Sequence, residues 1–310
     1  MQERSNWTRR GFLEATGAAL VAAATDSCGS LRAAPELDLI IDCHAHVYSE
    51  DEKTYPAMEK PYRPPAGTGT VAHLEREMQS SGVKSVMAVQ TLTFYHWDNS
   101  FLADTSRDNK RIMAGVCALN PDDPASPKIL EKYVKSYNVR AMRSIPAKSG
   151  KLDDPGVEAL WATAERLGIV INAFVDAPKQ GEVETMVKRH LKLPVVIDHC
   201  LNLKAGPTLQ PTLKAMQALA ALPTVHAKLS FVPTGSAEEY PCRDMHDACR
   251  TIIKEFGPER CLWGSCFPCE LWCPKVTYAQ HLRIFTHEIG LDERTKRALL
   301  GETPRRLWFS

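Results

Sequence analysis

The sequence predicts a (β/α)8 TIM barrel, a closed ring of parallel strands with helices outside it. Short apolar and β-branched runs alternate with amphipathic helical stretches along almost the whole chain. Eight such runs are present, and a helical stretch follows each one, which is the order of a parallel sheet with crossover helices. Polar residues stand at the ends of several runs. A doubly wound open sheet is the main alternative.

The predicted strands are rich in Val, Ile, Leu and Ala, as expected for parallel strands covered on both faces. They lie at residues 39–46, 85–90, 112–118, 139–143, 169–174, 195–199, 225–230 and 261–264. Apolar residues between them recur at helical spacing. This spacing predicts helices at residues 68–81, 98–108, 125–137, 154–167, 180–190, 210–221, 241–256, 277–288 and 291–300.

Two segments have other expected roles. The stretch from Tyr48 to Gly69, rich in proline, tyrosine and charge, predicts a loop that crosses the carboxyl ends of the strands. At the other end of the chain, Arg305-Arg306-Leu307-Trp308 is expected to pack the last helix against the barrel.

Residues 1–34 are predicted to be a Tat signal peptide and linker, which precede a barrel domain at residues 35–310. Thr8-Arg9-Arg10-Gly11-Phe12-Leu13-Glu14 is a twin-arginine motif, and the small apolar run 15–24 follows it. This run of about ten residues is too short to span a bilayer but suits the hydrophobic region of a signal peptide. We therefore expect export through the Tat pathway and a periplasmic location. A soluble amino-terminal helix is the alternative.

Composition excludes several classes of partner. The 38 basic and 37 acidic side chains are evenly mixed and give a net charge of +1, so no basic stripe for nucleic acid is present. No apolar stretch after residue 35 is long enough for a membrane span, and no stable membrane anchor is expected. The pairing of the ten cysteines cannot be deduced from the sequence, and self-association into a homo-oligomer stays open.

The most informative motif is Asp42-Cys43-His44-Ala45-His46, at the end of the first predicted strand. Strand alternation places Asp42, His44 and His46 on one face and the two small residues on the other. Two imidazoles at this spacing can hold a divalent metal ion or form a proton-transfer pair. Polar residues at a strand exit, without chemistry, are the alternative.

Other strand ends carry further candidates. In a barrel the carboxyl ends of the strands meet at one face, where active sites of this fold lie. The polar residues expected there are Gln90, Arg143, Asp198, His199, Lys228, Ser230, Ser265 and Cys266. Alternation allows only one of Asp198 and His199 to face the mouth, and His199 is the expected one.

Several of these side chains, and some on loops, suggest how a ligand is held. Arg143 and Lys228 are candidate anchors for a substrate carboxylate, with a structural ion pair as the alternative, and Gln90 is a candidate substrate-binding residue. Aromatic and imidazole side chains on loops are expected over the mouth, with surface or core packing as the alternative; they are Tyr48, His96 and Trp97.

Short motifs along residues 38–309 carry a family resemblance. They are D-C-H-A-H at 42–46, A-V-Q at 88–90 with D-N-S at 98–100, N-P-D-D-P at 120–124, R-A-M-R at 140–143, V-V-I-D-H at 195–199, A-K-L-S at 227–230, P-E-R-C-L-W-G-S at 258–265 and L-L-G-E-T-P-R-R-L-W at 299–308. In this order they resemble the amidohydrolase-related (amidohydrolase 2) family of the metallo-dependent hydrolase superfamily. That family includes lactonases of dicarboxylated pyrones and sugar lactones, and decarboxylases of aromatic or muconate acids. The resemblance assigns His44, His46 and His199 to metal or catalytic positions.

The chain departs from the family pattern at two positions. The family usually ends strand 8 with G-S-D, whereas this chain has Gly264-Ser265-Cys266. The family usually carries a histidine on strand 5, and Phe174 is the counterpart here. A carboxylate is ionised at neutral pH, whereas an ordinary thiol, with a pKa of about 8.5, is mostly protonated.

Three roles for Cys266 remain open. Its thiolate could complete a zinc site with His44, His46 and His199. It could be a nucleophile activated by His199. The third alternative is a site that has lost its chemistry.

Neighbouring cysteines suggest further sites. Cys261, Cys266, Cys269 and Cys273 have a spacing superficially like that of iron–sulfur ligands, but the barrel places Cys261 and Cys266 at opposite ends of strand 8. Cys266 and Cys269 could bind metal or form a disulfide, and the nearby Glu270 could replace the missing carboxylate.

We therefore expect an exported hydrolase that cleaves a C–O bond of a carboxylated lactone or ester, a small anionic substrate. His44, His46, His199 and Cys266 are expected to hold zinc, with His199 and Cys266 also catalytic, and a metal-bound or histidine-activated water attacks. A metal-dependent decarboxylase is one alternative. A non-catalytic binding homologue is the other.

Overall fold

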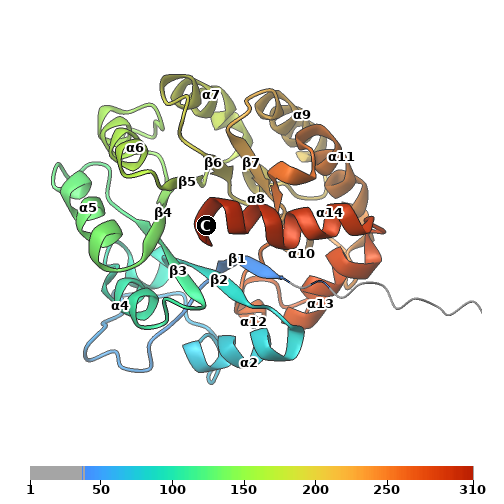
Figure 1. The fold of residues 1–310 in the computed structure, drawn as a ribbon, viewed down its shortest axis with the longest axis horizontal. Coiled ribbons are helices and arrows are strands. Elements are labelled where there is room, and N and C mark those ends of the chain that lie inside the picture. Colours follow the sequence, from blue (N-terminus) through green and yellow to red (C-terminus); the bar gives the residue numbers. More distant parts are fainter. Residues whose placement is uncertain (1–36, 38, 310) are drawn as a thin grey trace, which may run out of the picture. The chain divides into compact units, whose positions relative to one another are not determined.

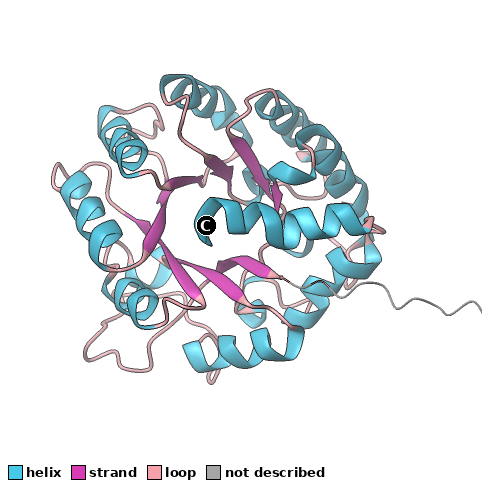
Figure 2. Ribbon diagram, in the orientation of Figure 1, coloured by secondary structure: helices cyan, strands magenta, loops and turns pink. Residues whose placement is uncertain are grey.

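The computed structural model describes residue 37 and residues 39–309, and it has the predicted barrel. Residues Leu39–Ser310 form one compact unit. The strands form a ring inside a layer of helices (Figures 1 and 2). They are β1 Ile41–Ala45, β2 Ser85–Val89, β3 Met113–Ala118, β4 Val139–Ser144, β5 Val170–Ala173, β6 Val195–Ile197, β7 Val225–Lys228 and β8 Cys261–Leu262.

All neighbouring strands are parallel and follow one another in sequence order, which excludes the doubly wound alternative. The segment after β8 returns to β1 and closes the ring. There the Cys43 N–H donates to the Trp263 carbonyl at 3.1 Å, and the His46 N–H donates to the Phe267 carbonyl at 2.8 Å. The predicted fold class is confirmed.

The long helices cover the outside of the barrel near the predicted positions. They are α2 Val71–Ser81, α4 Ser100–Asp108, α5 Ser126–Ser136, α6 Pro155–Leu167, α7 Gln180–Arg189, α9 Leu209–Ala220, α11 His246–Phe256, α13 Tyr278–Arg283 and α14 Glu293–Arg297. π-Helical turns at Ile284–Glu288 and Ala298–Glu302 lengthen α13 and α14. Local chemistry fixes many ends. In α6, Asp154 caps the first turn by accepting from the Gly156 N–H at 3.0 Å, and Gly168 ends the helix with φ 67°.

Four short helices follow the ends of strands and were not predicted. They are α3 Leu92–Tyr95, α8 His199–Asn202, α10 Phe231–Gly235 and α12 Cys269–Trp272. Each is only four or five residues long, so no helical period is detectable in the sequence. The segment from Tyr48 to Gly69 contains neither helix nor strand, as predicted.

The core fills the barrel interior and includes the carboxyl terminus of the chain. Trp308, 5% exposed, packs among barrel residues that include Ile41 and Leu262, and Leu307 and Phe309 pack against the same cluster. This confirms the packing expected for the last helix, which Figure 1 shows across one end of the barrel. The opposite end is left for the candidate site.

No helix in the described part of the chain is both long enough and apolar enough to span a bilayer. The twin-arginine motif and the apolar run that follows it lie outside the described residues.

Candidate active site

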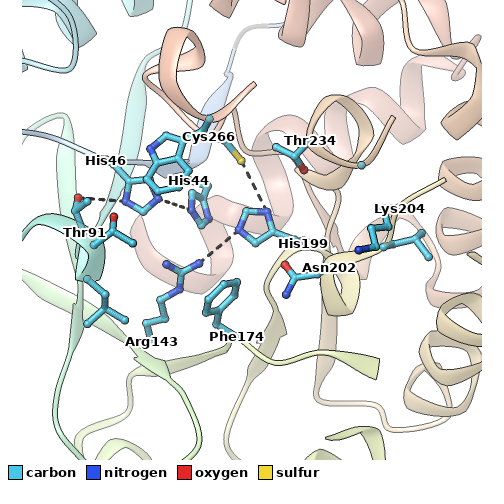
Figure 3. A pocket seen from close by; sticks show the side chains of 15 residues that line it. His44, His46, Thr91, Arg143, Phe174, His199, Asn202, Lys204, Thr234 and Cys266 are labelled. Carbon is cyan, nitrogen blue, oxygen red and sulfur yellow. Dashed lines mark hydrogen bonds between the residues drawn. The ribbon is translucent and has the colours of Figure 1, made fainter. Parts of the chain in front are cut away.

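A cavity of about 340 Å³ opens at the carboxyl ends of the strands. Figure 3 shows the imidazoles, the thiol and the guanidinium gathered in it. Its lining combines these groups with several apolar side chains: His44, His46, Thr91, Leu92, Thr93, Arg143, Phe174, His199, Asn202, Leu203, Lys204, Thr234, Gly235, Cys266 and Trp272.

His44 and His46 point into the cavity from β1 and the residue that follows it. Their Nε2 atoms are 3.1 Å apart, and Nδ1 of His46 lies 2.9 Å from the Val89 carbonyl. Because a carbonyl only accepts, Nδ1 of His46 carries the proton, and its Nε2 presents a lone pair to His44. Burial lowers the pKa of His46 to about 3 and holds the pKa of His44 well below its usual range, so both rings are neutral.

His199 reaches the cavity through an unusual turn of the backbone. The four residues of α8 all have left-handed conformations, with φ of 50° at His199, 48° at Cys200, 62° at Leu201 and 53° at Asn202. The turn is held by burial of Leu201 and by the Cys200 thiol, which donates to the Lys228 carbonyl at 3.2 Å. It directs both His199 and Asn202 into the cavity.

Three side chains surround the His199 ring. Arg143 Nη2 lies 3.4 Å from its Nε2, Ser230 Oγ lies 2.9 Å from its Nδ1, and Cys266 Sγ lies 3.8 Å from the same Nδ1. A guanidinium can only donate, so Nε2 is the acceptor and Nδ1 carries the proton. Burial lowers the pKa of His199 to about 3, which keeps the ring neutral.

Cys266 completes the cluster from the segment after β8. One ligand atom each of His44, His199 and Cys266 lies within 4.8 Å of the others. Cys266 has a left-handed φ of 55°, and burial raises the pKa of its thiol well above the ordinary value. The four residues predicted to hold a metal ion therefore lie together, although the binding of metal stays a prediction.

Asp42 does not line the cavity beside the histidines, contrary to the alternation argument. Its carboxylate accepts from the backbone N–H of His44 at 3.0 Å and of Ser265 at 2.9 Å. It also accepts from the hydroxyls of Ser265 at 2.5 Å and Tyr278 at 3.0 Å. Asp42 is therefore bonded to Ser265 and Tyr278, and its bonds to Ser265 hold the backbone next to Cys266.

The backbone after β8 approaches β1 closely, and a glycine permits this. A Cβ atom at Gly264 would lie 2.7 Å from the His44 Cβ and 3.0 Å from its backbone nitrogen. The G-S-C segment therefore lies directly against the histidine pair, which brings Cys266 into the cluster.

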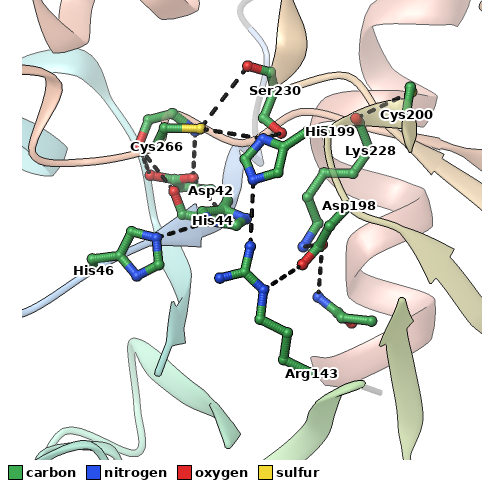
Figure 4. Close-up of polar contacts among 12 residues, drawn as sticks. Asp42, His44, His46, Arg143, Asp198, His199, Cys200, Lys228, Ser230 and Cys266 are labelled. Carbon is green, nitrogen blue, oxygen red and sulfur yellow. Dashed lines mark hydrogen bonds and ion pairs between the residues drawn. The ribbon is translucent and has the colours of Figure 1, made fainter. Parts of the chain in front are cut away.

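Arg143, Asp198 and Lys228 form a buried ion cluster below the imidazoles (Figure 4). Asp198 accepts from Arg143 Nε at 3.0 Å and lies 2.7 Å from Lys228 Nζ. The two cations lower the pKa of Asp198 although burial alone would raise it, and the carboxylate stays ionised. With neutral histidines above it, this cluster carries one net positive charge.

The prediction that His199, and not Asp198, faces the mouth agrees with the structure, in which His199 lines the cavity and Asp198 does not. β6 ends at Ile197, before both residues, so the left-handed turn and not the strand period separates them. Asp198 points into the barrel interior, and the left-handed turn brings His199 above it.

Two residues predicted to bind substrate do not line the cavity. Lys228 has no exposed surface and contacts Asp198, so it acts by holding that carboxylate. The Gln90 amide nitrogen donates to the carbonyls of His96 at 3.0 Å and Asp98 at 2.7 Å, which fixes the loop after β2. Arg143, by contrast, lines the cavity and is 6% exposed.

The loop side chains expected over the mouth are placed differently. Tyr48 packs in a cluster with Phe94 and Tyr95, and neither His96 nor Trp97 lines the cavity. Glu270 is 45% exposed in its side chain and lies 3.8 Å from His73 on α2, so it does not replace the family's carboxylate. These positions favour the packing alternative for the aromatic residues.

Some lining residues were missed by sequence reasoning. Trp272 lies 5.3 Å from the His46 ring between centroids, and Leu92, Asn202, Leu203 and Thr234 lie on short segments after other strands. Their position immediately after predicted strands is the only sequence feature that could have found them.

The described cysteines are all free thiols, so no disulfide joins Cys266 to Cys269. Cys269 and Cys273 donate instead to the Ser265 carbonyl, at 3.6 and 3.7 Å. Cys261 lies in β8, at the other end of that segment from Cys266, as the barrel argument against an iron–sulfur cluster predicted.

A parallel eight-stranded barrel with imidazoles gathered at the carboxyl ends of its strands has the architecture of the metallo-dependent hydrolase superfamily, with Cys266 where the family pattern has Asp. Residues 41–309 match the family model described as Amidohydrolase, and the chain belongs to this amidohydrolase 2 family.

Known proteins share this fold at low sequence identity. The chain is 26% identical to the L-fucono-1,5-lactonase of Burkholderia ambifaria over 239 residues, which cover 74% of this chain and 80% of that protein. A probable 2-pyrone-4,6-dicarboxylic acid hydrolase from Acinetobacter baumannii, with citric acid bound, superposes with a TM-score of 0.72 at 18% identity, covering 87% of this chain and 99% of that one. An amidohydrolase from Burkholderia multivorans with bound zinc superposes with a TM-score of 0.70 at 22% identity, with the same coverage.

Proposed function

We propose that this protein is a hydrolase that cleaves a C–O bond of a carboxylated lactone or ester, with zinc as its metal. The observation that supports this most directly is the convergence of His44, His199 and Cys266 within 4.8 Å, with Nε2 of His46 at 3.1 Å from His44. The lactonase relative and the zinc-containing relative agree with this reaction class and this metal.

The hydrogen bonds of the histidine pair fit a cation. Nδ1 of His44 is buried and has no partner among the described residues. If Nε2 of His44 donates to His46, this Nδ1 is an unpaired acceptor. If Nε2 of His44 is unprotonated, two lone pairs face each other at 3.1 Å, an arrangement that a cation satisfies. Imidazole nitrogens with one thiolate are a ligand set that zinc accepts.

When bound, zinc would polarise the substrate carbonyl and lower the pKa of a water molecule to about 7. Cys266 would supply the negative charge that Asp supplies in the family pattern. His199 lines the cavity and would hold the metal as a neutral imidazole, beside Cys266. Arg143 holds the substrate carboxylate, because its Nε and Nη2 have partners whereas Nη1 has none among the described residues.

The alternative in which the Cys266 thiol is itself the nucleophile is less well supported. A nucleophilic thiol needs a nearby base, and Nδ1 of His199, 3.8 Å away, already carries a proton. Burial also raises the pKa of this thiol.

The decisive experiment is product analysis on zinc-loaded protein with a panel of carboxylated lactones and esters. We expect ring opening or ester cleavage, with one proton released and no CO₂, and loss of activity after chelation. Release of CO₂ would instead support the decarboxylase, and zinc binding without turnover on a broad panel would support the binding homologue.

A further inference from the structure

We infer that the ligand of this site is a small monoanion in which one carboxylate is attached to a flat, largely apolar ring, and that polyhydroxylated sugar lactones are excluded. This inference rests on the proposed function for the reaction, whereas the class of ligand is argued from the residues that line the cavity.

The wall offers apolar surface on several sides. Trp272 lies against His46 on the β1 side, at 5.3 Å between ring centroids. Phe174 lies on the β5 side, at 5.8 Å from the His199 ring and 3.9 Å below the Arg143 guanidinium. Leu92, at the start of α3, and Leu203, after α8, add aliphatic surface. Such a wall stabilises an apolar ring by removing it from water.

The charges of the wall favour one anionic group at depth. Among the described residues, no Asp or Glu lines the cavity, and Arg143 is the single buried cation that does. The other lining cation, Lys204, is exposed at the rim. The second buried cation, Lys228, is paired with Asp198 and does not reach the cavity.

Apart from the proposed metal ligands, Arg143 and Lys204 at the rim, the wall has few polar groups that could bind the hydroxyls of a sugar ring. The Asn202 amide nitrogen already donates to Asp176 at 2.6 Å, and the Thr91 hydroxyl lies 3.4 Å from His46. Thr93 and Thr234 add only two hydroxyls. Each sugar hydroxyl buried without a partner would cost about 1–3 kcal/mol. The cavity volume of about 340 Å³ also lies near the lower limit for small-molecule sites, which suits a single ring.

The test is calorimetric titration of the zinc-loaded full chain with acetate, benzoate and gluconate. All three present one carboxylate to Arg143 and the metal, so differences among them report the rest of the ligand. We expect benzoate to bind at least about tenfold tighter than acetate, and gluconate no tighter than acetate.

Two wall variants and one control locate the effect. Trp272→Leu and Leu92→Asn should each reduce the preference for benzoate over acetate by several fold, and Leu191→Ala, which truncates a side chain that is 71% exposed, should not. Tighter binding of gluconate than of benzoate, equal binding of benzoate and acetate, or a preference unchanged in both wall variants would each overturn the inference. A benzoate preference without any hydrolysis would instead overturn the proposed function alone.

Discussion

His199 and Cys266 both have left-handed backbones, with φ of 50° and 55°. This conformation costs a non-glycine residue about 1–2 kcal/mol, so it persists only where neighbouring contacts impose it. Burial of Leu201 and the donors around Asp42 impose it here. The strain therefore coincides with the cluster that we propose to be catalytic.

Replacing Cys266 tests whether the thiol is a metal ligand. We expect Cys266→Ala to lower zinc affinity on the order of 100-fold or more, since losing a residue that only orients a ligand already costs about 10- to 100-fold. Cys266→Asp, which restores the carboxylate of the family pattern, should retain zinc. Both are measured by metal analysis and competitive chelator titration.

Cys117→Ala is the matched control for that measurement, since it removes another fully buried thiol, on β3, outside the cavity. Equal zinc content in the wild type and Cys266→Ala would show that Cys266 is not a ligand.

Arg143 is expected to recognise the substrate carboxylate. A lysine ammonium lacks the planar fork with which Arg143 contacts Asp198 and His199 and still offers Nη1 to a substrate carboxylate. We therefore expect Arg143→Lys to lower kcat/KM for a carboxylated substrate by about 10- to 100-fold. Activity on a matched neutral ester should change much less. Arg140→Lys, on the same strand but exposed, is the control. An equal loss on both substrates would indicate a structural role for Arg143 in place of recognition.

His281 should make stability depend on pH. Burial lowers its pKa in the folded chain to about 4 from 6.5, and its Nδ1 accepts from the Trp263 indole at 3.0 Å. Below pH 6.5 His281 is protonated in the unfolded chain but stays neutral in the folded chain. The free energy of unfolding therefore falls as the pH falls, by at most about 1.4 kcal/mol per pH unit. The loss ends near pH 4.

Urea unfolding between pH 4 and pH 7 tests this effect. His281→Gln should have a shallower pH slope than the wild type, whereas His287→Gln, at an exposed position, should keep the wild-type slope. Identical slopes in all three proteins would contradict the buried, neutral state of His281.

Much of the candidate site could be predicted from the types of residue at the strand ends. The H-x-H motif and His199 were found because imidazoles at the ends of apolar strands are chemically distinctive. Asp42 was misplaced because its long-range donors, Ser265 and Tyr278, cannot be known from strand alternation. Trp272 was missed because it ends a one-turn helix whose position over the cavity leaves no period in the sequence.

At the scale of elements, α10 and the segment that follows α8, residues 203–205, form one wall of the cavity through direct backbone contact. The Ala205 N–H donates to the Gly235 carbonyl at 2.8 Å. A Cβ atom at Gly235 would lie 2.2 Å from the Leu203 carbonyl oxygen and 2.9 Å from the Lys204 Cα. Backbone atoms at that distance cannot move without separating the two segments.

We therefore expect Gly235→Ala to destabilise the protein by about 1–3 kcal/mol and to displace the turn that carries His199. Gly181→Ala is the matched control, because nothing lies within 4 Å of its Cβ position in α7. That substitution should stabilise the helix by up to about 1 kcal/mol. Denaturant unfolding measures both, and an unchanged Gly235→Ala protein would contradict the close packing.

The long helices and the strands were predictable because their patterns extend over enough residues to define a period. The short helices after β2, β6, β7 and β8 were not, since one turn contains no period. The left-handed turn at α8 contains no glycine, which is the residue that usually indicates such a backbone in a sequence. Its geometry could therefore be seen only in the structure.

At the scale of the whole molecule, export stays a proposal that the described residues do not test. Replacing both Arg9 and Arg10 with Lys should retain the protein in the cytoplasm if the twin-arginine motif directs it. Cell fractionation with immunodetection measures the distribution, and replacement of Arg107 and Arg111 with Lys, far from the motif in the barrel domain, is the control. Unchanged distribution in the Arg9 and Arg10 variant would exclude Tat export through this motif.

The contacts of Asp42 also determine how late in translation the site can form. Its partner Ser265 lies 223 residues further along the chain, and Tyr278 lies 236 residues further. At about 5–20 residues per second, a ribosome needs roughly 10 to 45 s to make the intervening chain. His44 and His46 emerge early, but the segment that bears Cys266 and closes the ring emerges near the end. A nascent chain therefore cannot assemble the complete cluster, and any metal ion that needs all four ligands must be acquired after translation is nearly finished.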